Sequence, residues 1–400
     1  MRKWIWLIAA APLAFAAAQT IQHETKTVNI EIPVRVFKGA AFVDTLMLDD
    51  FEVWDNGQPQ KLEAVYLIKK TNIERREEAR AFVPRMARHF TLIFEMSEFD
   101  PRLDEGLDFF MNNVLLPSDS LVVVTPMRTY RMKAEASFSQ ERSQILKRLV
   151  GLVRRDILIG NSEYRSLLED LKSIARNLAG SISGSASSIE GQFSGGSFEE
   201  QLQNYAAGLS RFEALRQVDE KQFLEFARYL KTIEGQKDVF LFYQREFVPN
   251  LDPKIMNQFL GLYNSRVDVV LSVMNLFDFS KRDVTFDVEA VKRAFSDSST
   301  AVHFLFLTTQ AEGAPGIVME ERTEDAFEPF REMARATGGF SEVSANFEFI
   351  MKSAAAALEN YYLLYYTPVG YKADGAFHDI KVKVKSGGYR LAHRSGYIAD

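Results

Sequence analysis

The sequence predicts an α/β protein in which a doubly wound domain is inserted into, or flanked by, an antiparallel β-sandwich built from the N- and C-terminal segments. Near both ends of the chain, residues 28–37 and 377–385 alternate apolar and polar side chains with the period of two that is typical of half-buried strands. Between them, short apolar runs alternate with helical repeats, as in a parallel sheet covered on both faces. These runs are 90–94, 121–125, 239–243 and 303–307.

The first eighteen residues are expected to be a signal peptide. Arg2 and Lys3 precede an apolar stretch from Trp4 to Phe15, and Ala16–Ala18 supply small residues at a cleavage site. Pro12 interrupts that stretch, which is too short for a retained transmembrane helix. We therefore expect a periplasmic or secreted protein with no integral membrane span after cleavage.

The segment after the signal peptide, residues 19–68, is predicted to supply the N-terminal strands of the sandwich. It contains the hairpin signal Asp55-Asn56-Gly57 between two strand-like runs. Residues 69–88 are densely charged and are predicted to be a linker. The last segment, residues 359–400, is predicted to form the strands that complete the sandwich.

The α/β domain is predicted to span residues 89–358. A helical insertion is expected at about 150–235, and it contains a Gly/Ser-rich loop at 180–197. Within the insertion, an apolar stripe recurs at helical spacing and is either core or a docking surface: Leu202, Tyr205, Leu209, Phe212 and Leu215.

Four tyrosines mark the strand that opens the C-terminal segment: Tyr361, Tyr362, Tyr365 and Tyr366. Because side chains alternate along a strand, one pair is expected to face the core and the other the surface. Sandwich packing is the simpler interpretation, and a partner-binding platform is the alternative.

Composition excludes several classes of function. The chain has 48 basic and 54 acidic residues, a formal net charge of −6 that does not favour a nucleic-acid partner. It has no Cys, which excludes disulfides, thiolate-bound zinc, iron–sulfur clusters and a thiol nucleophile. The chain contains no P-loop, GxGxxG or GxSxG motif, and His303 on a buried strand is expected to be a core residue.

Four segments resemble the bacterial von Willebrand factor type A-related family common in Acidobacteria. They are NIEIPVRVF (29–37), DDFEVWDNGQPQKLEAVYLI (49–68), ATGGFSEVSANFEFIMKSAAAALENYYLLYYTP (336–368) and FHDIKVKVKSGGYRLAHRSGYIA (377–399). Their order and spacing carry the resemblance more than any single piece. The resemblance implies a von Willebrand type A, Rossmann-like domain and a role in protein–protein interaction.

The resemblance also implies where a metal-ion-dependent adhesion site would lie. In the family the first strand ends in Asp-x-Ser-x-Ser, a Thr follows in a second loop, and an Asp follows a later strand; their oxygens suit Mg²⁺. Here the matching positions hold Glu95, Ser97 and Phe99 in the first motif, Ser139 in the second loop and Gln244 after the later strand. The implied site is therefore degenerate, with Glu95, Ser97 and Ser139 as its remaining candidate ligands.

Two interpretations of this site remain open. In one, a modified Mg²⁺ site is completed with the help of Glu98 or Asp100. In the other, no metal binds, Phe99 packs, and Glu95 pairs with Arg128 or Arg245. The second is favoured, because octahedral Mg²⁺ tolerates displaced ligands poorly.

The function expected from the sequence is therefore a non-enzymatic protein-interaction module with no catalytic residues and no resident cofactor. Its partner would be a protein in the cell envelope or outside the cell. The alternatives are an envelope hydrolase and an intact Mg²⁺-dependent adhesion protein that uses a modified site.

Overall fold

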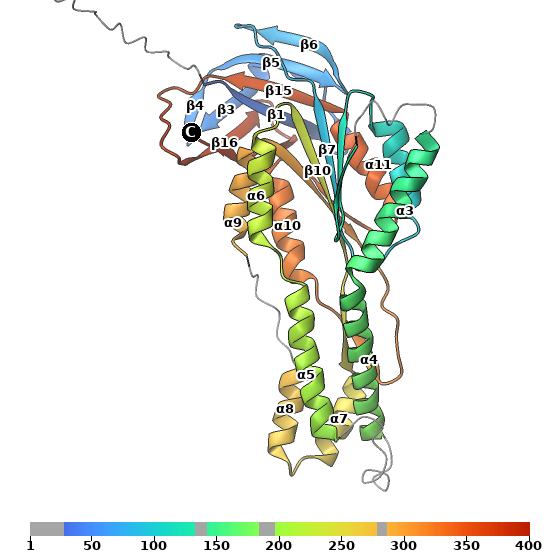
Figure 1. Cartoon of the computed structure of the whole chain (residues 1–400). Helices are drawn as coiled ribbons and strands as arrows, with labels where there is room; N and C mark the ends of the chain where they lie inside the picture. Colours follow the sequence, from blue (N-terminus) through green and yellow to red (C-terminus); the bar gives the residue numbers. More distant parts are fainter. Residues whose placement is uncertain (1–27, 133–141, 184–196, 278–285) are drawn as a thin grey trace, which may run out of the picture.

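The structure, a computed structural model, describes residues 28–132, 142–183, 197–277 and 286–400. Figure 1 shows three parts along one long axis: antiparallel sheets at one end, a central sheet with helices on both faces, and a helical arm at the other end. The mixed α/β class predicted from the sequence is confirmed. The predicted signal peptide, residues 1–18, lies outside the described residues.

The central sheet has six strands in the order β14-β12-β10-β7-β8-β9. All neighbouring pairs are parallel except β8 and β9, which form an antiparallel edge. The middle strands are buried almost throughout, which explains their continuous apolar runs. The strands are β7 (Arg88–Glu95), β8 (Ser120–Val124), β9 (Thr129–Met132), β10 (Gln236–Gln244), β12 (Thr300–Leu307) and β14 (Ser341–Ser344).

Helices cover both faces of this sheet. One face packs against α1 (Leu103–Phe109), the π-helical turn η2 (Phe110–Val114), α3 (Arg142–Gly160) and α11 (Phe347–Leu358). The other face packs against α6 (Glu220–Lys231), α9 (Val288–Asp297) and α10 (Glu324–Ala336). The helices α1 and α11 approach so closely at Gly106 that a Cβ there would lie 2.0 Å from the Phe347 ring, so this position requires glycine.

The chain ends form two antiparallel sheets that share one hydrophobic core. Strand β15 (Asn360–Tyr366), from the C-terminal segment, lies between two N-terminal strands, so neither segment forms its sheet alone. The first sheet also contains β1 (Ile30–Lys38), β2 (Ala41–Phe42), β5 (Leu62–Lys69), β6 (Asn72–Glu78) and β17 (Arg390–His393). The second contains β3 (Phe51–Asp55), β4 (Gln58–Gln60), β16 (Phe377–Val384) and β18 (Gly396–Ile398), and the short helix η1 (Leu48–Asp50) precedes β3.

The predicted linker at 69–88 is wrong for residues 72–78, which form strand β6 on the edge of the first sheet. Its charged side chains have partners: Arg75 donates to the carbonyl oxygens of Asp44 and Leu46, and Glu77 accepts from the Leu48 amide. Charges are common on edge strands, where they discourage pairing with other chains. A dense run of charge is therefore compatible with a strand.

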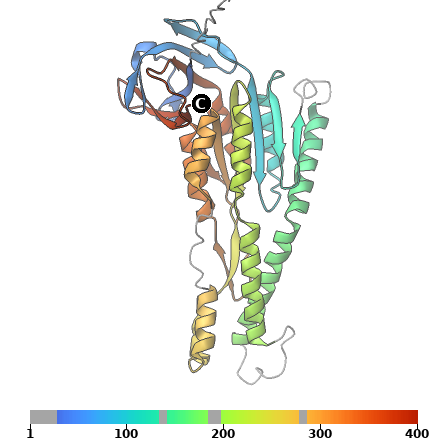
Figure 2. The same ribbon diagram turned by 60° about the vertical axis from the view of Figure 1, so that its left-hand side comes forward.

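The helical arm has a hydrophobic core of its own, separate from that of the central sheet. It is built from α4 (Ser162–Ser183), α5 (Phe198–Leu215), α7 (Pro253–Leu262), α8 (Val267–Phe277) and the antiparallel ribbon of β11 (Phe247–Leu251) and β13 (Ile317–Glu321). Figure 2 shows the arm extending away from the body in a second view as well. Of the predicted apolar stripe, Leu202, Tyr205, Leu209 and Phe212 are buried in this core, whereas Leu215 is exposed.

The predicted insertion at 150–235 therefore differs from the arm. Helix α3 packs on the sheet through Leu149, Val153 and Ile157, and α6 packs on the opposite face. Residues 247–277 and 317–321, outside the predicted insertion, contribute to the arm. Helical periodicity identifies an apolar face but not its packing partner. The Gly/Ser-rich loop predicted at 180–197 falls largely outside the described residues, and α4 continues through Ser183.

All four tyrosines of β15 are buried, which corrects the expectation that one pair faces the surface. Tyr362 and Tyr366 face the sandwich core. Tyr361 and Tyr365 lie in a second cluster, where Tyr365 stacks on Phe82 at 4.6 Å between ring centroids. The four tyrosines therefore pack on both faces of the sheet, and the alternative of an exposed binding platform is wrong.

Candidate functional site

The predicted metal site maps to the carboxyl edge of the central sheet, where β7 and β10 end side by side. Ser97 Oγ donates to Gln244 Oε1 at 3.4 Å, and the Glu98 amide donates to the same oxygen at 3.0 Å. Tertiary structure thus brings Ser97 and Gln244 together from positions 147 residues apart. The amide oxygen of Gln244 thus binds the loop that follows β7. Gln244 occupies the position that the family resemblance assigns to a metal-binding Asp.

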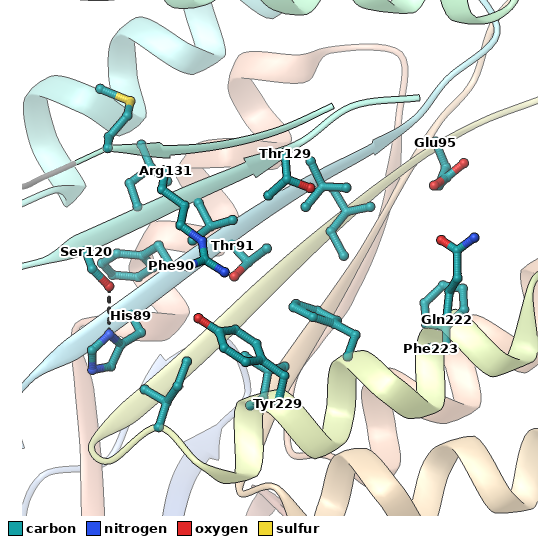
Figure 3. Close-up of a pocket in the computed structure, with 18 residues that line it drawn as sticks. His89, Phe90, Thr91, Glu95, Ser120, Thr129, Arg131, Gln222, Phe223 and Tyr229 are labelled. Carbon is teal, nitrogen blue, oxygen red and sulfur yellow. Dashed lines mark hydrogen bonds between the residues drawn. The ribbon is translucent and has the colours of Figure 1, made fainter. Parts of the chain in front are cut away.

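Glu95 is also at this edge, but its side chain enters a groove beside α6. Figure 3 shows it facing Gln222 across one end of that groove. Desolvation and the nearby charge of Glu246 raise the pKa of Glu95 to about 7. The side chain is exposed at this end of the groove, so water screens both effects.

The other residues considered for the metal site have different roles. Asp100 accepts two hydrogen bonds from the Arg102 side chain at 3.0 and 2.6 Å. Burial alone would raise the pKa of Asp100, but these bonds and the charge of Arg102 outweigh it and lower that pKa. Phe99 packs against the sheet core under the Arg154 guanidinium, 5.5 Å from the ring centroid. The expected packing of Phe99 is therefore confirmed.

Two expectations about this site differ from the structure or fall outside it. Among the described residues, Glu95 forms an ion pair with neither Arg128 nor Arg245, the two suggested partners, and Arg245 instead pairs with Glu321 at 3.0 Å. Ser139 lies outside the described residues. Within the part of the chain that the structure describes, no group of three His, Cys, Asp or Glu side chains is placed to hold a metal ion.

The base of the arm packs against the loop that follows β7 at this edge of the sheet. Asn161, between α3 and α4, donates to the Met96 carbonyl oxygen at 2.8 Å. Tyr164 at the start of α4 is buried, and desolvation together with the charge of Glu246 raises its pKa. Arg216, after α5, binds Glu246 and the Arg322 carbonyl oxygen. The loop after β7 is therefore in contact with the arm at Met96, while Glu95 and Glu98 stay exposed.

A groove of about 600 Å³ opens between α6 and strands β7, β8 and β9 (Figure 3). We call it the α6 groove. Its apolar walls are Ile93, Val122 and Val124 from the sheet and Phe223, Phe226, Tyr229, Leu230 and Ile233 from the helix and the loop that follows it. Polar groups lie at the ends, along the rim and, in the case of the buried Thr91, within the β7 wall: His89, Thr91, Glu95, Ser120, Thr129, Arg131 and Gln222. A mostly apolar cavity with a few convergent polar groups is the usual form of a small-molecule site.

Sequence reasoning missed this groove. The only signal available was the alternation in β9, which puts Thr129 and Arg131 on one face and Tyr130 and Met132 on the other. That pattern does not reveal that α6 lies opposite β9.

His303 is fully buried, and its Nε2 donates to Asp238 Oδ1 at 3.0 Å. Desolvation lowers its pKa, so the imidazole is neutral at neutral pH. The expectation that His303 is a core residue is confirmed.

Comparison with known proteins identifies no family. No family model matches the chain, and no curated protein matches it. A comparison with solved structures lists the human COPII-coat protein Sec24c at 8% sequence identity and a TM-score of 0.31. That match covers 78% of this chain and 43% of the Sec24c chain, so the aligned region is less than half of Sec24c. Among the described residues, none of the helices is long and apolar enough to span a membrane.

Proposed function

We propose that this protein is an exported, non-enzymatic protein-interaction module of the von Willebrand factor type A class with a degenerate adhesion site. The class is supported by the six-stranded sheet with its antiparallel edge β9 and by the sequence resemblance. The loss of metal-dependent adhesion is supported by Gln244, whose amide oxygen accepts from Ser97, and by the base of the arm, which contacts the neighbouring Met96 carbonyl oxygen. The location proposed is the periplasm or the cell exterior.

The observation that carries this proposal is the outer face of α8 in the arm. Val269 and Val273 are buried against the arm core. Val267, Leu271 and Met274, at helical spacing on another face, are 61%, 53% and 40% exposed. A helix that is apolar on opposite faces is usually buried on both, and an exposed apolar stripe is typical of an interaction surface. We call these three residues the tip stripe.

The tip stripe continues at the end of α7, where Leu262 is 51% exposed. Charged side chains border it: Arg266 pairs with Asp268 at 3.2 Å. An apolar centre with a charged border is the usual composition of a protein–protein interface. The function proposed for the arm is to carry this surface away from the body.

The second candidate function is an envelope hydrolase. It is favoured by one observation, the raised pKa of Glu95, since a carboxyl group that titrates near neutrality suits a general acid. The nearby carboxylate Glu246 is bound by Arg216 rather than directed at a shared substrate position. The proposal therefore remains a non-enzymatic module.

Site-specific photo-crosslinking in the native cell tests the proposal. A photoreactive amino acid is placed at Leu271 of the tip stripe and, as a matched control, at Val369, which is 83% exposed on the sandwich. We expect a discrete protein adduct at position 271 that is absent at 369 and is lost when Val267→Asp and Met274→Asp are added. Equal adducts at both positions, or an adduct that needs Mg²⁺ and disappears with Ser97→Ala, would contradict the proposal.

A further inference from the structure

The α6 groove lies where the helical layer of the central sheet is incomplete. On that face α6, α9 and α10 pack against strands β10 and β12 and the near side of β7. The structure describes no helix over β8 and β9 on the same face, and the valines Val122 and Val124 there are only half-buried. Sheets of this type are normally covered by helices on both faces. The gap exposes an apolar floor.

The groove is long and narrow. Its sheet wall runs from His89 to Glu95, about 20 Å at roughly 3.3 Å per residue. One end is closed by His89, which accepts from Ser120 Oγ at 2.6 Å and donates from Nε2 to the Glu234 carbonyl oxygen at 3.0 Å. The other end opens at the carboxyl edge of the sheet beside Glu95.

The apolar side chains lie below the rim of the groove. Ile93 is 7% exposed, and Phe223 and Phe226 are half-buried. A thin apolar chain fits between the strands and α6 and contacts both walls.

Among the described residues that line the groove, Arg131 is a cation on the rim. Arg131 projects from β9 toward Tyr229, with its guanidinium carbon 5.5 Å from the ring centroid (Figure 3). In the described part of the chain, no carboxylate pairs with Arg131. Arginine stacked on an aromatic ring keeps its N–H groups free to bind an anion in a bidentate way.

We propose that the α6 groove binds one molecule of a medium-chain amphiphile with a carboxylate head group, a fatty acid in chemical class. Arg131 binds the carboxylate, and the chain runs between Ile93 and Val124 on one side and Phe223 and Phe226 on the other. Arg131 lies level with Thr91 across β8. The stretch of β7 from Thr91 to Glu95, with Ile93 between them on the groove side, is about 13 Å long at roughly 3.3 Å per residue, which suits a chain of medium length. This site is independent of the tip stripe.

Calorimetric titration with decanoate and with decanol, its uncharged analogue, tests the proposal on the full chain. We expect one decanoate per chain. Arg131→Gln should weaken decanoate about tenfold or more, because a charge-assisted hydrogen-bonded pair is lost, and should leave decanol unchanged. Arg128→Gln is the matched control, because Arg128 is an exposed arginine of the same hairpin that does not line the groove, and it should change neither.

A groove-filling variant, Val122→Phe, should weaken both ligands while the thermal midpoint of the chain stays unchanged. The proposal fails if neither ligand binds saturably, if Arg131→Gln and Arg128→Gln weaken decanoate equally, or if Val122→Phe leaves both affinities unchanged. Because none of these variants touches the tip stripe, failure here is distinguishable from failure of the proposed interaction function.

Discussion

His303 and Asp238 form a hydrogen bond of 3.0 Å in which both side chains are completely buried. They lie on neighbouring strands β12 and β10, near the amino ends of the central sheet. Arg35 reaches Asp238 from strand β1 of the sandwich, with 3.5 Å between its guanidinium nitrogen and Oδ1, and also donates to the Gly338 carbonyl oxygen at 3.0 Å. One buried carboxylate thus joins the sandwich to the central domain.

Asp238→Ala should destabilise the protein by about 3–5 kcal/mol, because it leaves the buried charge of Arg35 without its partner. Urea denaturation measures this change in the free energy of unfolding. The matched control is Glu169→Gln, which breaks an exposed ion pair with Lys172 and should cost less than about 1 kcal/mol. Equal effects of the two variants would contradict the role assigned to Asp238.

Glu95→Gln should stabilise the protein slightly above pH 7, because the exposed carboxyl group is screened by water, and should have little effect below pH 4.5. The folded pKa of Glu95, about 7, lies above its ordinary value of 4.5, so the folded state binds more protons between these values. Stability therefore falls as pH rises through that window, and a neutral side chain removes the loss. Thermal midpoints across the window measure this; a stabilisation that does not depend on pH would show that the carboxyl group does not titrate there.

Millimolar Mg²⁺ should leave the thermal midpoint unchanged in the wild type and in Ser97→Ala alike. A ligand that binds only the folded state raises the midpoint, so an unaltered value reports no specific site. The reason for this expectation is that Gln244 replaces a carboxylate and its amide oxygen accepts from Ser97 and from the Glu98 amide. An upward shift in the wild type that Ser97→Ala abolishes would restore the alternative of an intact adhesion site.

Phe212→Ala should destabilise the arm by about 3–5 kcal/mol, since Phe212 is fully buried in the arm core. The arm core and the cores of the central sheet are separate clusters. Hydrogen exchange should therefore accelerate in α4 and α5 while β7 and β10 stay protected. Leu215→Ala, on the same helix but 43% exposed, is the matched control and should change little. Uniform acceleration across the chain would show that the arm and body unfold together.

The buried strands were predictable from the sequence because each one carries its own signal. Leu92, Ile93 and Phe94 form part of a continuous apolar run, and such a run is buried wherever it lies in a parallel sheet. The arm was predictable only in part. Helix α8 (Val267–Phe277) is apolar on opposite faces. The sequence alone does not indicate that one of these faces packs in the arm core while the other contacts none of the described elements.

The two candidate sites also differ in how far the sequence could predict them. Ser97 and Gln244 were placed by the family resemblance, and their contact follows from the adjacency of β7 and β10. The α6 groove had no comparable signal, because its walls come from β7, β8, β9 and a helix about ninety residues later.

The sequence by itself determined the α/β class, the buried strands and the exclusion of cysteine chemistry. These are properties of local periodicity and residue identity. Tertiary structure decided that the arm contacts the loop after β7, that Glu95 enters a groove and that Asp238 joins two domains. These depend on which apolar faces meet, and that choice is made by packing between segments distant in the chain.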